Sequence, residues 1–393
     1  MKISNVYIGG WFQRTMLQLT EIYDFLRDCK SQLDLDPEKL QEFRKSLEIG
    51  KIDYGVAGEE YIEFTTALNM KVKVFEDGLI TVNNTNVSDD TLFADLDKIT
   101  DYYENKLSPA FNYLFSLGAP VPKELAHIET IYPYFIICDN VTKEDISDLL
   151  SRTEKQKYFE FSSEKYDVVR GDKYYFINNK KQSLENIERY IESQVFIREF
   201  KGQLHRYLNI HRIIWEKIDN IKDKVNVKGS EIVKFTTKLE GYSKTVNLID
   251  GRINQMSTYI STREKIVKAD PELTEFLAIS GYRYETLRDT LNYIQYLWDM
   301  TQTHLNQAKS LFSEIKSDVT NSSVSNLTVV TSMSAGASLL GLLNESLPTV
   351  NLIGFVYFLI LALIGWISTK ILSFIGKQRK YEVTDVEYDK DIK

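Results

Sequence analysis

The sequence predicts an α+β cytosolic domain followed by long antiparallel helices, a coiled-coil-like stalk helix and a C-terminal two-helix transmembrane hairpin. Three observations carry this prediction. Residues 1–183 mix strand alternation with amphipathic helical patterns, and residues 184–318 hold long helical patterns. From residue 319 onward the chain contains two long stretches without a charge, 319–344 and 346–369.

Composition narrows the classes of function. The net charge of −8 and the pI near 5.3 argue against a general nucleic-acid-binding surface, so we expect no nucleic acid partner. The two cysteines, Cys29 and Cys138, have no metal-ligand spacing and are expected to be free thiols in a reducing compartment. The N-terminus lacks the apolar core and cleavage site of a signal peptide, so the bulk of the chain is predicted to be cytosolic.

The first domain, 1–183, is predicted to be a cytosolic sensor with mixed elements. Strand alternation runs through 61–82 on both sides of an Asp77-Gly78 turn, and a second hairpin, 165–179, turns at Gly171-Asp172. A strand within 127–139 precedes a helical pattern at 141–153. Further amphipathic patterns predict helices over 15–30, 37–48 and 90–117.

Two long helical patterns, 184–222 and 230–268, form the next region, 184–270. The VNVKG segment between them is a plausible turn, which predicts an antiparallel helical pair. The ADPEL segment then supplies the start of another helix, with Asp270 as its cap and Pro271 at the first position.

The stalk helix, 271–318, contains an apolar seam with alternating spacings of three and four residues. Its members are Leu287, Leu291, Ile294, Trp298, Thr301, Leu305, Ala308, Phe312, Ile315 and Val319. Such a seam fits either a long helix packed on its own domain or a coiled coil between copies of the chain. Because it continues in register as far as Leu343, we favour self-association.

The membrane hairpin is predicted over 319–376. Sixteen consecutive apolar or glycine residues, 352–367, predict one span at about 351–372. The tail, 377–393, opens with a basic cluster that stays on the cytoplasmic side, so the number of spans must be even. The other span is then about 319–343, and both termini are cytoplasmic.

The first span is unusually polar, because twelve residues of 319–344 are Ser, Thr or Asn. A helix that turns this face toward copies of itself around an axis avoids exposing it to lipid, and it thereby forms the wall of a pore. The predicted pore-lining residues are Ser322, Ser325, Asn326, Val329, Ser332, Met333, Gly336, Leu340 and Leu343. Asn344 and Glu345 are predicted to form the outer loop.

No enzymatic motif stands out, so we expect no catalytic residues, no metal site and no enzyme activity. The chain lacks phosphate-binding glycine loops and the GxSxG signature, and His205 and His211 are spaced too far apart for a ligand pair on one helical face. A nucleotide-like ligand would require aromatic rings and basic groups. The candidate ligand-binding residues are Trp11, Arg14, Arg152, Arg170 and Tyr174.

The order of these parts resembles the CorA family of two-span divalent-cation channels. The similarity is one of architecture over nearly the whole chain. The family's Gly-Met-Asn signature at the outer end of the first span is missing, and Gly341-Leu342-Leu343-Asn344 stands in its place. In this respect the chain is similar to the divergent CorA-like membrane effectors of type III CRISPR loci.

The resemblance implies a homo-oligomer, expected to be a pentamer, in the bacterial inner membrane. It implies a channel opened by a nucleotide second messenger, such as an S-adenosylmethionine–AMP conjugate, that acts in antiviral defence. Two alternatives remain open at this point. In the first, the chain is a CorA-type transporter of divalent cations (Mg, Co or Ni). In the second, it is a non-conducting, membrane-anchored coiled-coil scaffold or receptor.

Overall fold

The computed structural model describes residues 2–13, 18–56, 59–85, 87–115, 133–153, 156–222, 226–269, 271 and 274–342, together with separate positions between 356 and 382. The chain divides into two compact units. The first comprises Met1–Ile210 and Asp250–Gln295, and the second comprises His211–Ile249 and Tyr296–Lys393.

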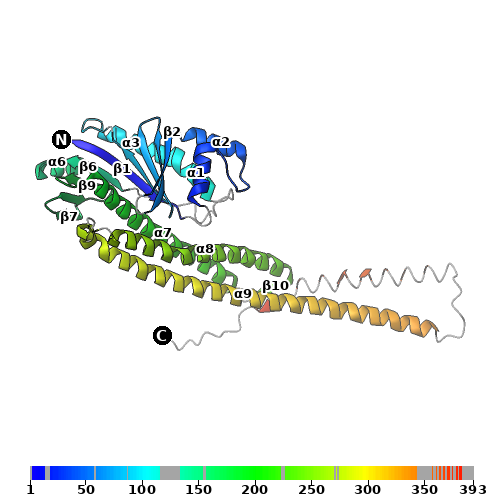
Figure 1. Cartoon of the computed structure of the whole chain (residues 1–393). Helices are drawn as coiled ribbons and strands as arrows, with labels where there is room; N and C mark the ends of the chain where they lie inside the picture. Colours follow the sequence, from blue (N-terminus) through cyan, green and yellow to red (C-terminus); the bar gives the residue numbers. More distant parts are fainter. Residues whose placement is uncertain are drawn as a thin grey trace, which may run out of the picture. The chain divides into compact units, whose positions relative to one another are not determined.

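The first unit is built on a mixed nine-stranded sheet with the order β2-β3-β4-β5-β1-β6-β9-β8-β7 (Figure 1). The strands are β1 (Ile3–Trp11), β2 (Ile49–Val56), β3 (Glu60–Thr66), β4 (Met70–Phe75), β5 (Leu79–Asn84), β6 (Tyr134–Asp139), β7 (Phe159–Ser162), β8 (Tyr166–Arg170) and β9 (Tyr174–Asn179). Neighbouring strands are antiparallel except for β6 and β9, which are parallel.

Short helices follow the strands of this unit. They are α1 (Leu19–Asp28), α2 (Pro37–Ser46), α3 (Leu92–Tyr102), a π-helical turn (Tyr103–Leu107), α4 (Ser108–Phe115) and α6 (Lys143–Thr153). The start of α2 follows the expected chemistry, since the Asp36 carboxylate accepts a hydrogen bond from the Glu38 amide and Pro37 occupies the first helical position.

The central strand β1 joins the two halves of the sheet. It pairs with β5 on one side and with β6 on the other. Its two glycines are required by close packing, because a Cβ on Gly9 would lie 2.6 Å from the Ile80 carbonyl oxygen and one on Gly10 would lie 1.7 Å from the Tyr103 hydroxyl. The YIGGW segment is therefore a β-strand that is closely packed on both faces.

Each face of the sheet contributes to a hydrophobic core. On one face, Ile8 belongs to a buried cluster that includes residues of α1, α2, α3 and α4. Next to it, Val6 joins a smaller cluster with residues of α3, β6 and α6. On the opposite face, Gly9 meets Val195 and Trp11 packs on Phe196, both of which belong to a long helix described next.

Three long helices follow the sheet and contribute segments to both units. They are α7 (Leu184–Lys222), α8 (Gly229–Ala269) and α9 (Thr274–Leu342). The predicted combination of a mixed α+β N-terminal part with subsequent long helices is confirmed. The 69 residues of α9 form one unbroken helix, which includes the predicted first span as far as residue 342.

The predicted seam is present, but it is buried within the chain. Leu291 and Ile294 are buried in the first unit, and Trp298, Leu305 and Phe312 are buried in the second. In the second unit, Trp298 contacts His211 of α7 and Phe312 contacts Phe235 of α8. Periodicity reveals a buried face, and over residues 287–315 the chain's own helices cover it, so its burial there requires no second copy.

A short two-stranded sheet ties the C-terminal tail to the second unit (Figure 1). β10 (Asn226–Lys228) lies between α7 and α8, and it pairs antiparallel with β11 (Lys380–Glu382). Val227 is fully buried opposite Tyr381. The tail thus returns to the tip of the α7–α8 hairpin.

Among the described residues, no helix combines the length and the apolar character needed to cross a bilayer. The predicted second span, 351–372, and the loop residues Asn344 and Glu345 lie mostly or wholly outside the described part of the chain, as does Leu343. Of the predicted pore-lining residues from 322 to 340, the backbone lies in α9, and only the Ser332 side chain is described; it is exposed.

Candidate functional site

A basic groove in the first unit is the strongest candidate for a ligand site. It has a volume of about 610 Å³ and lies between the β8–β9 hairpin, α7 and α9. Its basic side chains are Arg170, Arg198, Lys201, His205 and Arg283. Among the described residues that line it, none carries a carboxylate. The groove thus favours an anion.

Arg170 stands at the end of an aromatic stack. It is the cross-strand neighbour of Tyr175, and its guanidinium lies over the Tyr175 ring, 5.3 Å from the centroid. The Tyr175 ring in turn stacks on Phe135 of β6, with 4.7 Å between centroids. Since Tyr175 is buried between these neighbours, it orients Arg170 rather than offering a free face to a ligand.

Two buried donors of the groove lack acceptors among the described residues. Gln194 is 2% exposed; its Oε1 accepts a hydrogen bond from Arg283 Nη1 at 2.7 Å, but its Nε2 has no partner. The Nε of Arg170 is also without one. Both atoms are shielded from solvent, and unsatisfied buried donors of this kind cost free energy.

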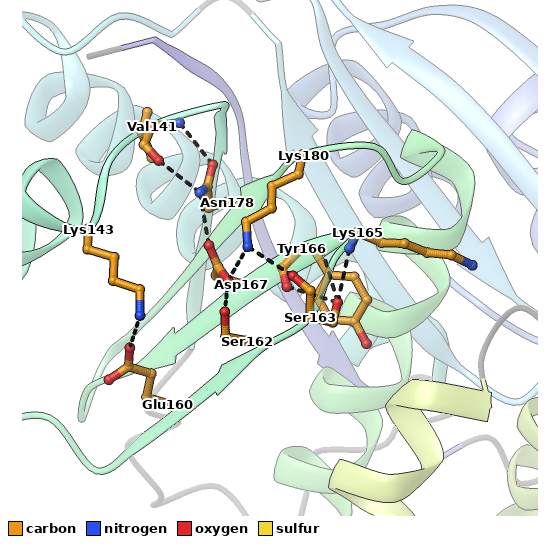
Figure 2. Close-up of polar contacts among 10 residues, drawn as sticks. All are labelled: Val141, Lys143, Glu160, Ser162, Ser163, Lys165, Tyr166, Asp167, Asn178 and Lys180. Atoms are coloured by element: carbon orange, nitrogen blue, oxygen red, sulfur yellow. Dashed lines mark hydrogen bonds and ion pairs between the residues drawn. The ribbon is translucent and has the colours of Figure 1, made fainter.

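A polar network anchors the hairpin that carries Arg170 (Figure 2). The buried Asp167 carboxylate of β8 accepts hydrogen bonds from Ser162, from Asn178 Nδ2 at 3.1 Å and from Lys180 Nζ at 2.6 Å. The Asn178 amide also bonds both backbone groups of Val141 at 3.0 Å. Burial by itself raises the pKa of Asp167, but these hydrogen bonds outweigh it and hold the pKa below its ordinary value.

Between Gln194 and His205, helix α7 carries one acidic residue, Glu199, and its side chain is turned inward. Glu199 follows Arg198 in the sequence, does not line the groove and is almost fully buried. Burial raises the pKa of Glu199 to about 7, against the opposing effect of Arg206 and Arg198. At neutral pH this carboxyl therefore neutralises the groove only in part.

The other predicted ligand residues do not gather at the groove. Trp11 is a core residue, 8% exposed, whose Nε1 donates to the Asp77 carbonyl at 2.9 Å. Arg152 forms a surface ion pair with Asp89 at 2.9 Å. Tyr174 stacks on Tyr134 and does not line the groove, and Arg14 lies outside the described residues.

Sequence reasoning thus found Arg170 and missed its partners from the helices. A signal for them exists, because Gln194, Arg198, Lys201 and His205 recur at spacings of four, three and four residues along α7. That spacing places them on one helical face, although its neighbours in the fold cannot be read from the pattern.

Comparison with known proteins adds little to this description. No protein-family model matches the sequence, and no curated protein matches it. Among solved structures, that of the full-length CmaX protein matches over 64% of this chain and 93% of that chain, with 12% identity and a TM-score of 0.23. A similarity at this level carries no argument about function.

Proposed function

We propose that the chain is a CorA-like membrane channel effector whose N-terminal unit binds an anionic, nucleotide-type ligand in the basic groove. It would act as a homo-oligomer, most simply a pentamer, in the bacterial inner membrane, with both termini cytoplasmic and without enzymatic activity. On the resemblance described above, we extend the proposal to a role in CRISPR-linked antiviral defence.

The observation that carries the membrane half is a stripe of exposed apolar side chains in the predicted second span. Its described apolar members are Val356, Ile360, Leu363, Trp366, Ile367 and Ile371, with Phe374 just beyond the span, all at helical positions and between 42% and 62% exposed. Their helical spacing puts them on one face, which also carries Lys370, whose Nζ lies over the Trp366 ring at 5.7 Å from the centroid. An apolar face that bears one lysine near its end, among the described residues, is rare in water and normal against lipid, where the lysine reaches the interface.

The β10–β11 pairing supports an even number of membrane crossings. Residues 380–382 can pair with 226–228 only if both lie on the same side of the bilayer. The segment between 318 and 380 therefore crosses either not at all or an even number of times. Together with the apolar stripe, this favours two crossings, independently of the basic residues in the tail.

The polar composition of the first span is compatible with a membrane helix. In α9 the hydroxyls of Thr320, Thr328 and Thr331 donate to backbone carbonyls of the preceding turn. Such back-bonding satisfies a hydroxyl within its own helix and lowers the cost of placing it in an apolar environment. The remaining polar groups are proposed to face the axis of the oligomer.

The groove suits phosphate groups, and α9 connects it to the proposed pore. A guanidinium group can bind phosphate oxygens through two hydrogen bonds. The groove has three guanidinium groups, those of Arg170, Arg198 and Arg283. Arg283 lies on α9, the same unbroken helix that carries the first span. A ligand that pulls on Arg283 acts directly on that helix, which is the proposed route of gating.

The proposal is tested with the full-length chain in liposomes. Ion flux is measured with and without ATP or the S-adenosylmethionine–AMP conjugate, and the mass of the assembly is measured in nanodiscs. Ligand-dependent flux through a ring of about five subunits supports the proposal. Flux without ligand and rescue of a magnesium-uptake defect would indicate a transporter, and a dimer without flux would indicate a scaffold.

A further inference from the structure

A second cavity of the first unit has a different character from the basic groove. It has a volume of about 810 Å³ and lies between strands β3 and β4, the N-terminal part of α7 and the C-terminal end of α8. Its lining alternates acidic and basic side chains with the rings of Tyr61 and Phe75. This size is within the range of small-molecule sites.

The buried wall of this cavity holds more carboxylates than cations. Arg263 is fully committed, since its Nε and Nη2 donate to Asp77 at 2.5 and 2.7 Å and its Nη1 donates to Glu59 at 2.6 Å. Lys73 donates to Glu188 at 2.6 Å. Four carboxylates, including Glu192, therefore face two cations among these buried groups.

Glu192 is the carboxylate without a close partner. Its side chain is 10% exposed, and its only polar contact among the described residues is Lys73 Nζ at 3.9 Å, beyond hydrogen-bond distance. Glu188, by contrast, is satisfied by Lys73 and by the Tyr7 hydroxyl at 2.8 Å. A buried carboxylate that lines a cavity and lacks a donor is incomplete without a ligand or a proton.

The surroundings of Glu192 suit an organic cation better than a metal ion. No group of three or more potential ligand side chains converges for a metal within the described part of the chain. The cavity instead has apolar walls, formed by Tyr61, Phe75 and the Ile266 and Val267 side chains. The Tyr61 and Phe75 rings lie 5.8 Å apart and form an aromatic surface.

We propose that this cavity binds a small organic cation, a primary ammonium carried on an apolar or aromatic body, with Glu192 as the partner of the ammonium group. The apolar body would lie against Tyr61, Phe75 and Ile266. This site is separate from the basic groove, so the inference does not depend on the channel or on its anionic ligand.

Binding at this site is coupled to a proton. Burial, first of all, raises the pKa of Glu192 to about 8; Lys73 and Arg263 oppose this effect, while Glu59 and Glu188 add to it. At pH 7 the carboxyl therefore holds a proton, which an arriving ammonium must displace. Affinity should rise with pH up to about 8, with release of up to about one proton per ligand below that value.

The test uses 2-phenylethylamine, with 2-phenylethanol as its uncharged counterpart. Binding to the full-length protein is measured by calorimetry at pH 7 in buffers of different protonation enthalpy. We expect the amine to bind at least about tenfold more tightly than the alcohol and to release a proton. Equal binding of the two compounds, or amine binding without proton release, would overturn the proposal.

Two substitutions locate the site. E192Q is expected to weaken amine binding at least about tenfold and to reduce proton release, because the amide cannot ionise; any release that remains comes from Glu59, which also lines the cavity and whose pKa burial raises to about 7. The matched control, E164Q, changes an exposed carboxylate that does not line the cavity, and it should leave affinity within about twofold. If E192Q does not fold, I266W places a larger side chain in the cavity, leaves Glu192 unchanged and should block the amine. Unchanged binding in the variant that folds refutes the site.

Discussion

Asp77 and Arg263, 186 residues apart in the sequence, form a two-point ion pair at 2.5 and 2.7 Å, with side chains that are 8% and 4% exposed. Asp77 lies in the β4–β5 turn, and Arg263 lies near the end of α8. Burial opposes the charge on Arg263, but Asp77, and then Glu59, more than compensate and hold the pKa of the guanidinium above its ordinary value. This pair ties α8 to the sheet.

Removing one partner of this pair should be costly. Asp77→Ala leaves a buried guanidinium with Glu59 alone and removes the acceptor of the Leu79 amide, so we expect a loss of about 3–5 kcal/mol in the free energy of unfolding. Urea denaturation in detergent measures this change in the free energy of unfolding. The half-exposed pair of Lys71 with Glu63 is the control, and Glu63→Ala should cost far less. Equal losses would contradict the assigned role.

The hydrogen-bond network around Asp167 (Figure 2) predicts that the protein loses stability at low pH. The pKa of Asp167 is lowered from its ordinary value of 3.8. The Asp167 carboxylate therefore contributes fully to the free energy of unfolding above about pH 3.8, and this contribution is lost as the pH falls through the pKa of the folded state. Asp167→Asn should lower the melting temperature at pH 7 and flatten its fall below about pH 4. An unchanged loss of stability at low pH would show that other carboxylates dominate it.

The basic groove predicts a charge-dependent affinity. Lys201→Gln removes one cation from a groove without lining carboxylates, so we expect affinity for a nucleotide polyphosphate to fall about fivefold to tenfold. Equilibrium binding at fixed ionic strength measures this change. Lys181→Gln removes an exposed lysine that does not line the groove, and it should have little effect.

The apolar stripe predicts membrane integration. Leu363 lies near the middle of the proposed second span, and Leu363→Lys would cost about 2.5–3.5 kcal/mol of insertion free energy. Alkaline extraction of membranes should then release a large fraction of the protein. Gln378→Lys, an exposed position in the tail, should not change the extracted fraction. Full release of the unsubstituted chain would rule out the span.

The β10–β11 pairing predicts a cross-link. Asn226 and Glu382 are paired positions, so Asn226→Cys with Glu382→Cys, in a chain whose Cys29 and Cys138 are replaced by Ser, should form a disulfide in membranes under mild oxidation. The single Asn226→Cys variant should form none within the chain. A tail on the far side of the bilayer could not form this bond.

Local patterns predicted the elements well. The α7 bounds agree with the predicted 184–222, and the turn at Gly78, with φ of 90°, joins β4 to β5 as the Asp77-Gly78 pair indicated. Both depend on residues close together in the sequence. The strand β1 was not predicted, because Gly9-Gly10 weakens the strand pattern and its reason lies in Tyr103 and Ile80 far along the chain.

The sites depend on distant residues, which explains what the sequence did not reveal. Arg170 was a candidate from its hairpin alone, but Gln194 and Arg283 join it only through the packing of α7 and α9. The same limit applies to the seam of α9. Its spacing identifies a buried face, and only the fold identifies the chain's own helices as its partner.

Helix α7 has a consequence beyond its role as a wall. Gln194 follows Glu192 by two residues, about 200° around the helix, and Arg198 and Lys201 lie on the side of Gln194. One flank of α7 is therefore acidic and the other basic, which gives the helix a dipole across its width. An anion in the groove and a cation in the cavity each weaken the field that opposes the other, so occupancy of the two sites is expected to be positively coupled.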